Sequence, residues 1–191
     1  MIPLQLNEVS KMRKTICLLA IALLLITEAG AQQPAKKEVK MDNELVIAGN
    51  AEGPVKYSIK APRSMGLNDS GRITISFSFE EGWYGYAETD GNMAAGWLPT
   101  KVEFEFSDGF EKNGGLITPP IVFKEGTDVY IGNEVKFVQP VKYTGKGKDG
   151  KLAYQKERII HVTVHYQTCD EEKCLPPVTD TVAVKINMRN Y

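Results

Sequence analysis

The stretch Ile73-Thr74-Ile75-Ser76-Phe77-Ser78-Phe79 (ITISFSF, residues 73–79) alternates large apolar residues with small polar ones. Successive side chains of a strand point to opposite faces, so this period of two predicts a strand with one buried and one wet face. The same alternation occurs in four other segments, at residues 55–59, 102–106, 162–166 and 182–186. Less regular strands are expected at Leu45–Ala48, Leu116–Lys124, Val129–Ile131 and Glu134–Tyr143.

Turn residues separate these predicted strands. Gly132-Asn133 predicts a tight turn, and Lys148-Asp149-Gly150 predicts the tip of a long hairpin. Pro119-Pro120 and Pro140 indicate edge positions or bends, because proline cannot donate a hydrogen bond to a neighbouring strand. No long stretch has apolar residues at helical spacing. About eight strands in one domain predict an all-β fold, an immunoglobulin-like β-sandwich of two antiparallel sheets.

The N-terminal segment has the features of a secretory signal. The basic residues Lys11, Arg13 and Lys14 precede an apolar run, and Ala29-Gly30-Ala31 provides a small-residue cleavage site. We therefore expect a signal peptide over residues 1–31, with Met12 as an alternative start. The apolar run is shorter than the roughly 20 residues that span a bilayer, which argues against an uncleaved anchor. Residues 32–42 are polar and predict a flexible leader, and residues 43–191 form the predicted sandwich domain.

The charge balance excludes two classes of partner. The whole chain has 23 Lys and Arg against 24 Asp and Glu. Cleavage would leave a net charge of about −2, without the basic surface that binds nucleic acid or an anionic membrane. No second apolar stretch approaches spanning length, so we expect no stable membrane insertion after cleavage.

Two cysteines remain after cleavage, Cys169 and Cys174, because Cys17 lies in the signal. An exported compartment permits disulfides, and an even number favours one intramolecular bridge. A predicted strand runs into Cys169 and another follows Cys174, so the pair flanks the tip of a hairpin-like connection. Such a connection can bring the two Cα atoms within the roughly 4.4–6.8 Å that a disulfide requires.

The bridge is either a structural staple or a redox pair. Closing a loop of about six residues removes roughly 2 kcal/mol of unfolded-chain entropy, against about 4.7 kcal/mol for a loop of 100 residues. A short loop is therefore a weak staple, and an exposed tip admits the thiol of another protein. The acidic residues Asp170, Glu171 and Glu172 should raise the thiol pKa while Lys173 opposes them, so we expect thiols that are mostly protonated at neutral pH.

The segment Tyr166-Gln167-Thr168-Cys169 followed by Cys174-Leu175-Pro176-Pro177 resembles the redox motif of the N-terminal periplasmic domain of the DsbD thiol:disulfide interchange family. Gly82–Tyr86 and Tyr130–Val141 resemble further segments of that domain, and the resemblance covers residues 42–188. It implies an immunoglobulin-like sandwich in the periplasm. It also implies a carrier that takes electrons from a membrane electron transporter and passes them to thioredoxin-like proteins, disulfide isomerases or cytochrome c maturation factors.

The resemblance assigns roles to particular residues. Cys169 and Cys174 would be the catalytic pair, with Cys174 forming the mixed disulfide with the partner. Tyr84 and Tyr86 match the active-site tyrosines of the family, although packing alone would also explain them. Phe123 would be the aromatic residue of a loop that caps the cysteines. No cofactor or metal is implied, because the sulfur atoms themselves carry the electrons.

The sequence departs from the family pattern at three places. Pro119-Pro120-Ile121-Val122 replaces acidic residues of the cap loop, which leaves shielding of the cysteines open. The spacer between the cysteines is one residue shorter than usual. The sequence ends at Tyr191, so we expect a stand-alone relative without a membrane transporter or a thioredoxin-like domain. The alternative function is a secreted immunoglobulin-like binding module with a static disulfide.

Two weaker patterns do not support other chemistry. Gly145, Gly147 and Gly150 match the spacing of a dinucleotide-binding motif, but no helix is expected after them. His161 and His165 lie on one strand face near the cysteines, a set that zinc accepts. Histidines on the polar face of a strand are more often solvated, so no metal site is predicted. Nothing connects a particular serine to either histidine, so no hydrolase triad is predicted.

Overall fold

The structure, a computed structural model, describes residues 38–41, 44–49, 53–147, 149–151 and 155–189. The expected signal peptide and residues 32–37 of the expected leader lie outside the described residues. Glu38–Met41 (β1) also falls within the expected flexible leader, yet it forms a strand that pairs antiparallel with Glu44–Ala48 (β2). No helix in the described ranges is long and apolar enough to cross a bilayer.

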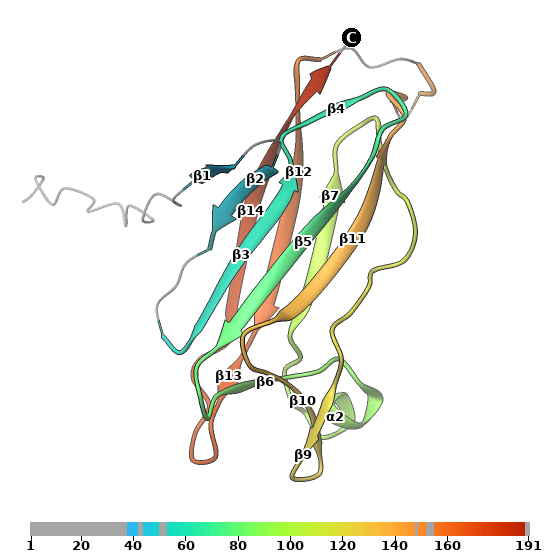
Figure 1. Ribbon diagram of the computed structural model, residues 1–191. Helices are drawn as coiled ribbons and strands as arrows, with labels where there is room; N and C mark the ends of the chain where they lie inside the picture. Colours follow the sequence, from blue (N-terminus) through green and yellow to red (C-terminus); the bar gives the residue numbers. More distant parts are fainter. Residues whose placement is uncertain (1–37, 42–43, 50–52, 148, 152–154, 190–191) are drawn as a thin grey trace, which may run out of the picture. The chain divides into compact units, whose positions relative to one another are not determined.

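Three sheets make up the described fold (Figure 1). Sheet A has the order β1-β2-β3-β5-β11-β8, and its remaining strands are β3 (Val55–Pro62), β5 (Ser70–Phe79), β11 (Val135–Tyr143) and β8 (Phe110–Lys112). Sheet B has the order β4-β14-β12-β7, formed by β4 (Ser64–Gly66), β14 (Val178–Arg189), β12 (Glu157–Tyr166) and β7 (Lys101–Phe106). Sheet C has the order β13-β6-β10-β9, formed by β13 (Thr168–Cys169), β6 (Tyr84–Tyr86), β10 (Thr127–Ile131) and β9 (Val122–Lys124). Among the described strands, every pair is antiparallel except β4 with β14.

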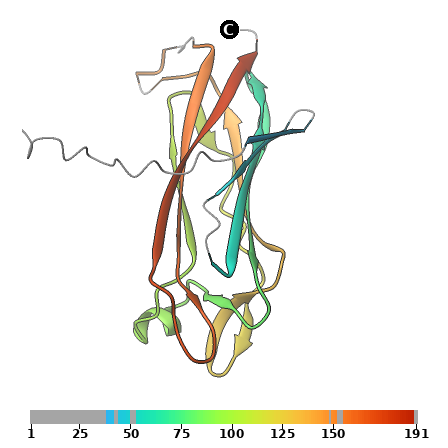
Figure 2. The same ribbon diagram turned by 90° about the vertical axis from the view of Figure 1, so that its left-hand side faces the viewer.

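Sheets A and B face each other as the two layers of a sandwich (Figure 2). The alternating residues of the ITISFSF stretch are buried on β5, and they pack in one core with alternating residues of β12 and β14. Phe77 lies near the centre, with the rings of Tyr57, Phe137 and Tyr166 around it. The hydroxyl of Tyr57 on sheet A donates a hydrogen bond to the carboxylate of Asp180 on sheet B. The predicted immunoglobulin-like β-sandwich is confirmed.

Sheet C lies at one end of the sandwich and has two different faces (Figure 1). Tyr130 on β10 belongs to the main core, where its ring centroid lies 5.5 Å from that of Phe137. Its neighbour Val129 points the other way and belongs to a separate buried cluster with Tyr86 and Cys169. One face of sheet C therefore closes the end of the sandwich, and the opposite face holds the cysteine.

Two sequence expectations about strands are wrong in part. Only Val122–Lys124 of the expected strand Leu116–Lys124 is a strand, together with an isolated bridge between Ile117 and Val138. Pro119 and Pro120 interrupt the ladder because neither can donate a hydrogen bond. The expected hairpin around Asp149-Gly150 joins strands of different sheets, since β11 pairs within sheet A and β12 within sheet B. Alternation shows which face of a strand is buried but not which sheet it joins.

Candidate functional site

The two cysteines lie at the tip of the long hairpin of β12 and β14. These strands pair continuously from Glu157 opposite Asn187 to Tyr166 opposite Val178. The chain then leaves sheet B, and Thr168–Cys169 pairs with β6 of sheet C. The sequence prediction placed the pair at such a tip, and the register agrees with it.

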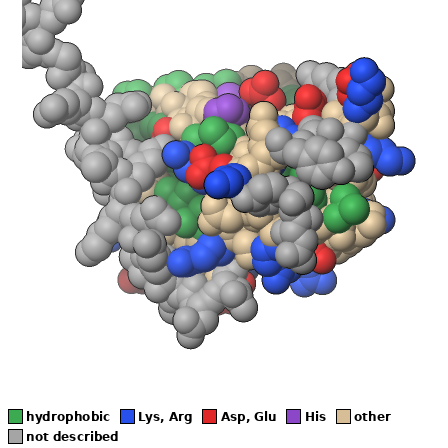
Figure 3. Space-filling model, turned by 90° about the horizontal axis from the view of Figure 1, so that it is seen from above, with side chains coloured by type: hydrophobic (Ala, Val, Ile, Leu, Met, Phe, Trp, Pro, Cys, Tyr) green, Lys and Arg blue, Asp and Glu red, His purple; other side chains and the backbone are tan. Residues whose placement is uncertain are grey.

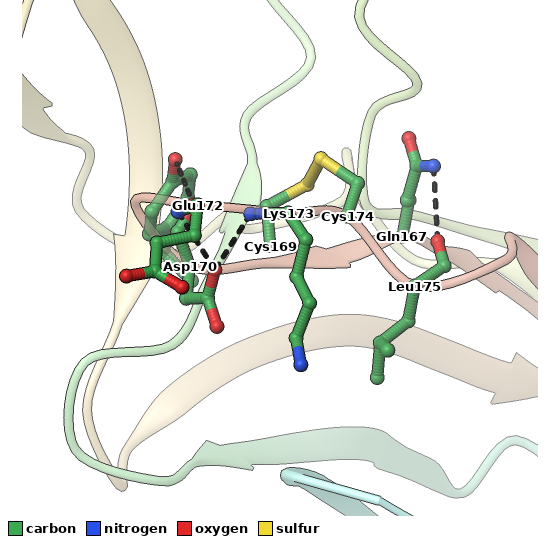
Figure 4. Close-up of a disulfide and its surroundings, with 8 residues drawn as sticks. Gln167, Cys169, Asp170, Glu172, Lys173, Cys174 and Leu175 are labelled. Carbon is green, nitrogen blue, oxygen red and sulfur yellow. Dashed lines mark hydrogen bonds between the residues drawn. A yellow bond between two sulfur atoms is a disulfide. The ribbon is translucent and has the colours of Figure 1, made fainter.

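A disulfide joins Cys169 to Cys174 with an S–S distance of 2.05 Å (Figure 4). The Cα atoms are 4.0 Å apart, slightly closer than expected from the sequence, and the two residues form an isolated antiparallel bridge. The two cysteines differ sharply in exposure, because Cys169 is 0% exposed whereas Cys174 is an exposed residue. Only one end of the disulfide is therefore open to another molecule.

Backbone hydrogen bonds hold the connecting loop independently of the disulfide. Leu175 N–H donates to Thr168 O, and Asp170 N–H donates to Lys173 O, each at 2.9 Å. The carboxylate of Asp170 accepts hydrogen bonds from the N–H groups of Glu172 at 2.9 Å and Lys173 at 2.8 Å. These donors hold the pKa of Asp170 below its usual value, as expected for an aspartate that closes a turn.

Tyr84 and Tyr86 contact the buried cysteine from β6. Tyr86 and Val129 form a buried cluster with Cys169, and Tyr84 packs against it. The Tyr84 hydroxyl donates to the carbonyl of Asp170 at 3.0 Å, so this ring also fixes the loop between the cysteines. The two tyrosine rings lie edge to face, 5.6 Å apart.

Gly85 explains how β6 presents both tyrosines on the outer face. A Cβ atom at this position would lie 2.5 Å from Thr100 Oγ1 and 3.1 Å from the ring of Phe79. Only glycine therefore allows β6 to lie this close to the core. Because side chains alternate along the strand, Tyr84 and Tyr86 then point away from the sandwich towards Cys169.

Trp97 covers the far side of Tyr86. The two rings stack with centroids 4.8 Å apart and an interplanar angle of 14°. Burial, followed by the hydrogen bond and charge of Tyr84, raises the pKa of Tyr86 to about 12. Burial in this cluster therefore favours the neutral form of the Tyr86 phenol.

The hairpin of β9 and β10 contacts the site through Lys124. Glu125 and Gly126 both have positive φ, 49° and 84°, which is typical of a two-residue hairpin turn. Lys124 Nζ lies 4.8 Å from the centroid of the Tyr84 ring and 3.2 Å from the carboxylate of Glu171. Phe123 is 73% exposed, and the register places it on the other face of β9 from Lys124. Its role as a cap stays a prediction.

The sequence matches the family described as "Thiol:disulfide interchange protein DsbD, N-terminal" over residues 54–186, a range that holds every residue of this site. The chain belongs to this family. No curated protein sequence matches the chain.

Solved structures similar to the chain include one of a DsbD-like protein. The N-terminal periplasmic domain of ScsB from Proteus mirabilis is 9% identical with a TM-score of 0.40, and the match covers 80% of this chain and 50% of that one. The chain thus spans about half the length of that structure. The GAE domain of GGA2p from Saccharomyces cerevisiae is 11% identical with a TM-score of 0.36, covering 83% of this chain and 100% of that domain. The yeast GGA1 GAE domain is 11% identical with a TM-score of 0.39, covering 73% and 97%.

Lys124 and Trp97 are the neighbours of this DsbD-family site that sequence reasoning missed. Lys124 reaches Glu171 across 47 positions of sequence, and no local pattern indicates such a contact. The only local signal was the Glu125-Gly126 turn, which would have defined the hairpin. Trp97 follows a five-residue helix, Asp90–Ala94 (α2), that is too short for periodicity to reveal.

The two histidines lie apart from this chemistry on sheet B. His165 Nδ1 lies 3.0 Å from Thr179 Oγ1, and its Nε2 lies 3.6 Å from the carboxylate of Glu103. His161 Nδ1 lies 3.8 Å from the carboxylate of Glu105. Among the described residues, no three His, Cys, Asp or Glu side chains gather as potential metal ligands.

Proposed function

We propose that this protein is a periplasmic thiol–disulfide exchange protein that passes electrons between partner proteins through Cys169 and Cys174. Membership of the DsbD N-terminal family supports the reaction class. The observation that carries the proposal is the unequal exposure of the two cysteines within one six-residue loop. A structural staple has no need of an accessible sulfur, whereas exchange requires one.

The exposure pattern favours one order of steps. A thiolate of the partner attacks Sγ of Cys174, a new disulfide forms between partner and Cys174, and the bond to Cys169 breaks. Cys169 leaves with the electron pair and takes up a proton. A second thiol of the partner then attacks the partner's sulfur in the mixed disulfide and releases Cys174, which is protonated in turn. Two electrons and two protons thereby move from the partner's dithiol to this protein, and the reverse sequence passes them to an acceptor.

The remaining site residues have supporting roles in this proposal. Tyr84 and Tyr86 keep water away from Cys169, and the Tyr84 hydroxyl holds the loop by its bond to Asp170 O. The loop keeps its hydrogen bonds in either redox state, because none of them involves a sulfur atom. The fold can therefore cycle between states with little rearrangement. A membrane electron transporter, thioredoxin-like proteins and disulfide isomerases are the proposed partners, and the signal-like N-terminal segment supports export.

A static disulfide in a secreted binding module is the second candidate. Complete burial of Cys169 favours it, since a buried sulfur is protected from reduction.

Trapping of mixed disulfides separates the two candidates. The Cys169→Ser variant keeps the exposed Cys174 and should form mixed disulfides with thiol proteins of a periplasmic extract, which dissolve on reduction. The Cys174→Ser variant keeps only the buried Cys169 and should form at least tenfold fewer. Absence of mixed disulfides from both variants would favour the static bridge.

A further inference from the structure

A groove of about 410 Å³ opens beside Tyr84 on the outer face of sheet C. We call it the Trp83 groove. Its apolar walls include the partly exposed side chains of Trp83 and Tyr84 and the exposed side chain of Ile131. Tyr84 is also the β-sheet partner of Cys169, so one end of the groove begins at the ring that contacts the buried cysteine. The volume suits a large apolar side chain with the backbone that carries it.

Apolar surface is concentrated at this end of the molecule. Nine large apolar side chains are exposed in the described part of the chain, and all but Leu67 and Ile117 lie in sheet C or in the segments adjoining its strands. They are Met93, Trp97, Leu98, Ile121, Val122, Phe123 and Ile131. Exposed apolar side chains that gather in one region mark a surface that contacts another molecule.

The rim of the groove and the loop between the cysteines are acidic. Five carboxylates lie here, those of Glu80, Glu81, Asp170, Glu171 and Glu172, against the two amino groups of Lys124 and Lys173. Within the described residues, Lys124 pairs with Glu171 and the Asp170 carboxylate accepts two backbone N–H groups. No described residue pairs with the side chains of Glu80, Glu81 or Glu172. Figure 3, which looks onto the other end of the sandwich, shows basic and acidic side chains intermixed there.

We propose that the Trp83 groove is the docking site for a thiol partner whose reactive cysteine is flanked by an apolar side chain and by basic residues. This inference rests on the exchange function proposed above. The apolar side chain would fill the groove while the partner's sulfur reaches the exposed Cys174. Basic residues complement the acidic rim, and they also favour the thiolate form of the partner's own cysteine. The acidic surroundings of Cys169 and Cys174 disfavour the thiolate form of these two cysteines, so the partner supplies the reactive thiolate.

Three cysteine peptides test the proposal on the oxidised mature protein. The peptides are Ac-Lys-Cys-Leu-Lys-amide, Ac-Glu-Cys-Leu-Glu-amide and Ac-Lys-Cys-Gly-Lys-amide, and mercaptoethanol is the uncharged reference thiol. Two peptide thiols become one peptide disulfide for each protein disulfide reduced, and each rate is divided by the measured thiolate concentration. The Lys–Leu peptide should react about tenfold faster than the Glu–Leu peptide and about threefold faster than the Lys–Gly peptide. About 0.5 M salt should bring the Lys–Leu to Glu–Leu rate ratio close to one, because salt screens charge. It should leave the Lys–Leu to Lys–Gly rate ratio nearly unchanged.

Variants of groove residues test whether these rate preferences arise at the Trp83 groove. Glu80→Gln with Glu81→Gln should reduce the charge preference about threefold, whereas the matched control pair Glu105→Gln with Glu157→Gln on sheet B should leave it unchanged. Ile131→Ser should bring the Leu-to-Gly ratio close to one. Reduction by mercaptoethanol combined with equal rates for all three peptides would overturn the docking proposal alone. Failure of mercaptoethanol to reduce the disulfide would overturn the exchange function and this proposal with it.

Discussion

Reduction of the disulfide should weaken the fold only slightly. The bridge closes a loop of about six residues, so its loss returns about 2 kcal/mol of chain entropy to the unfolded state. The hydrogen bonds from Leu175 to Thr168, from Asp170 to Lys173 and from Tyr84 to Asp170 survive reduction, because they involve no sulfur atom. For a domain of this size, about 2 kcal/mol corresponds to a decrease in Tm of about 4–8 °C.

Thermal unfolding followed by far-ultraviolet circular dichroism measures this difference on the oxidised and the reduced protein. The double variant Cys169→Ser with Cys174→Ser is the control, and its Tm should not respond to the reductant. The free energy by which the disulfide stabilises the fold also sets the difference in reduction potential between the folded and the unfolded chain. About 2 kcal/mol means that the potential of the folded pair lies about 40 mV below that of the unfolded chain. A decrease in Tm above about 15 °C, or loss of cooperative unfolding, would show instead that the bridge is a major source of the stability of the fold.

Four further predictions concern the residues around the disulfide. Gly85→Ala should destabilise the protein by about 1–3 kcal/mol in urea unfolding, because its Cβ would meet Thr100 and Phe79; Gly91→Ala, with open space around its Cβ, should not. Tyr84→Phe should cost about 1 kcal/mol in the same assay, since it removes the hydrogen bond to Asp170 O, and should speed reduction by mercaptoethanol. The pKa of Asp170 lies below 3.8 in the folded state. The stabilisation of the protein by the Asp170 carboxylate is therefore complete above a pH of about 4 and lost as the pH falls through the folded pKa. Asp170→Asn should remove that part of the acid dependence of Tm. The pKa of Tyr86 is raised to about 12, so the stability present below a pH of about 10 should fall as the pH rises towards 12. Burial also raises the pKa of Tyr130 and Tyr166, so absorbance titration of Tyr86→Phe should show one late phenolate fewer than the unaltered protein.

The large strands were predictable because each carries enough alternating residues to define its buried face. The seven residues of ITISFSF are an example, since all four apolar members are buried. Of the strands of sheet C, β9 and β10 overlap expected strands, but β6 and β13 were not predictable. β6 has three residues and β13 has two, which is too few for a period of two to stand out from chance. Their pairing depends on tertiary contacts such as the close approach of Gly85 to Phe79.

The cysteine pair could be predicted from sequence, but its asymmetry could not. Spacing and flanking strands placed Cys169 and Cys174 at a hairpin tip. Which sulfur is buried depends on Tyr86 and Val129, which reach Cys169 from strands far away in the sequence. The contact of Lys124 with Glu171 is of the same kind, because an ion pair between distant loops leaves no local pattern.

The reduction potential of the Cys169–Cys174 pair, measured by equilibration of the protein with glutathione or dithiothreitol buffers, decides between the exchange function and a structural disulfide. Redox-active proteins span about −270 to −120 mV, and structural disulfides lie below about −300 mV. We expect a value within the first range, because a short loop on an exposed tip adds little stability to the oxidised form. A value below about −300 mV would contradict the exchange function and identify the disulfide as a structural bridge.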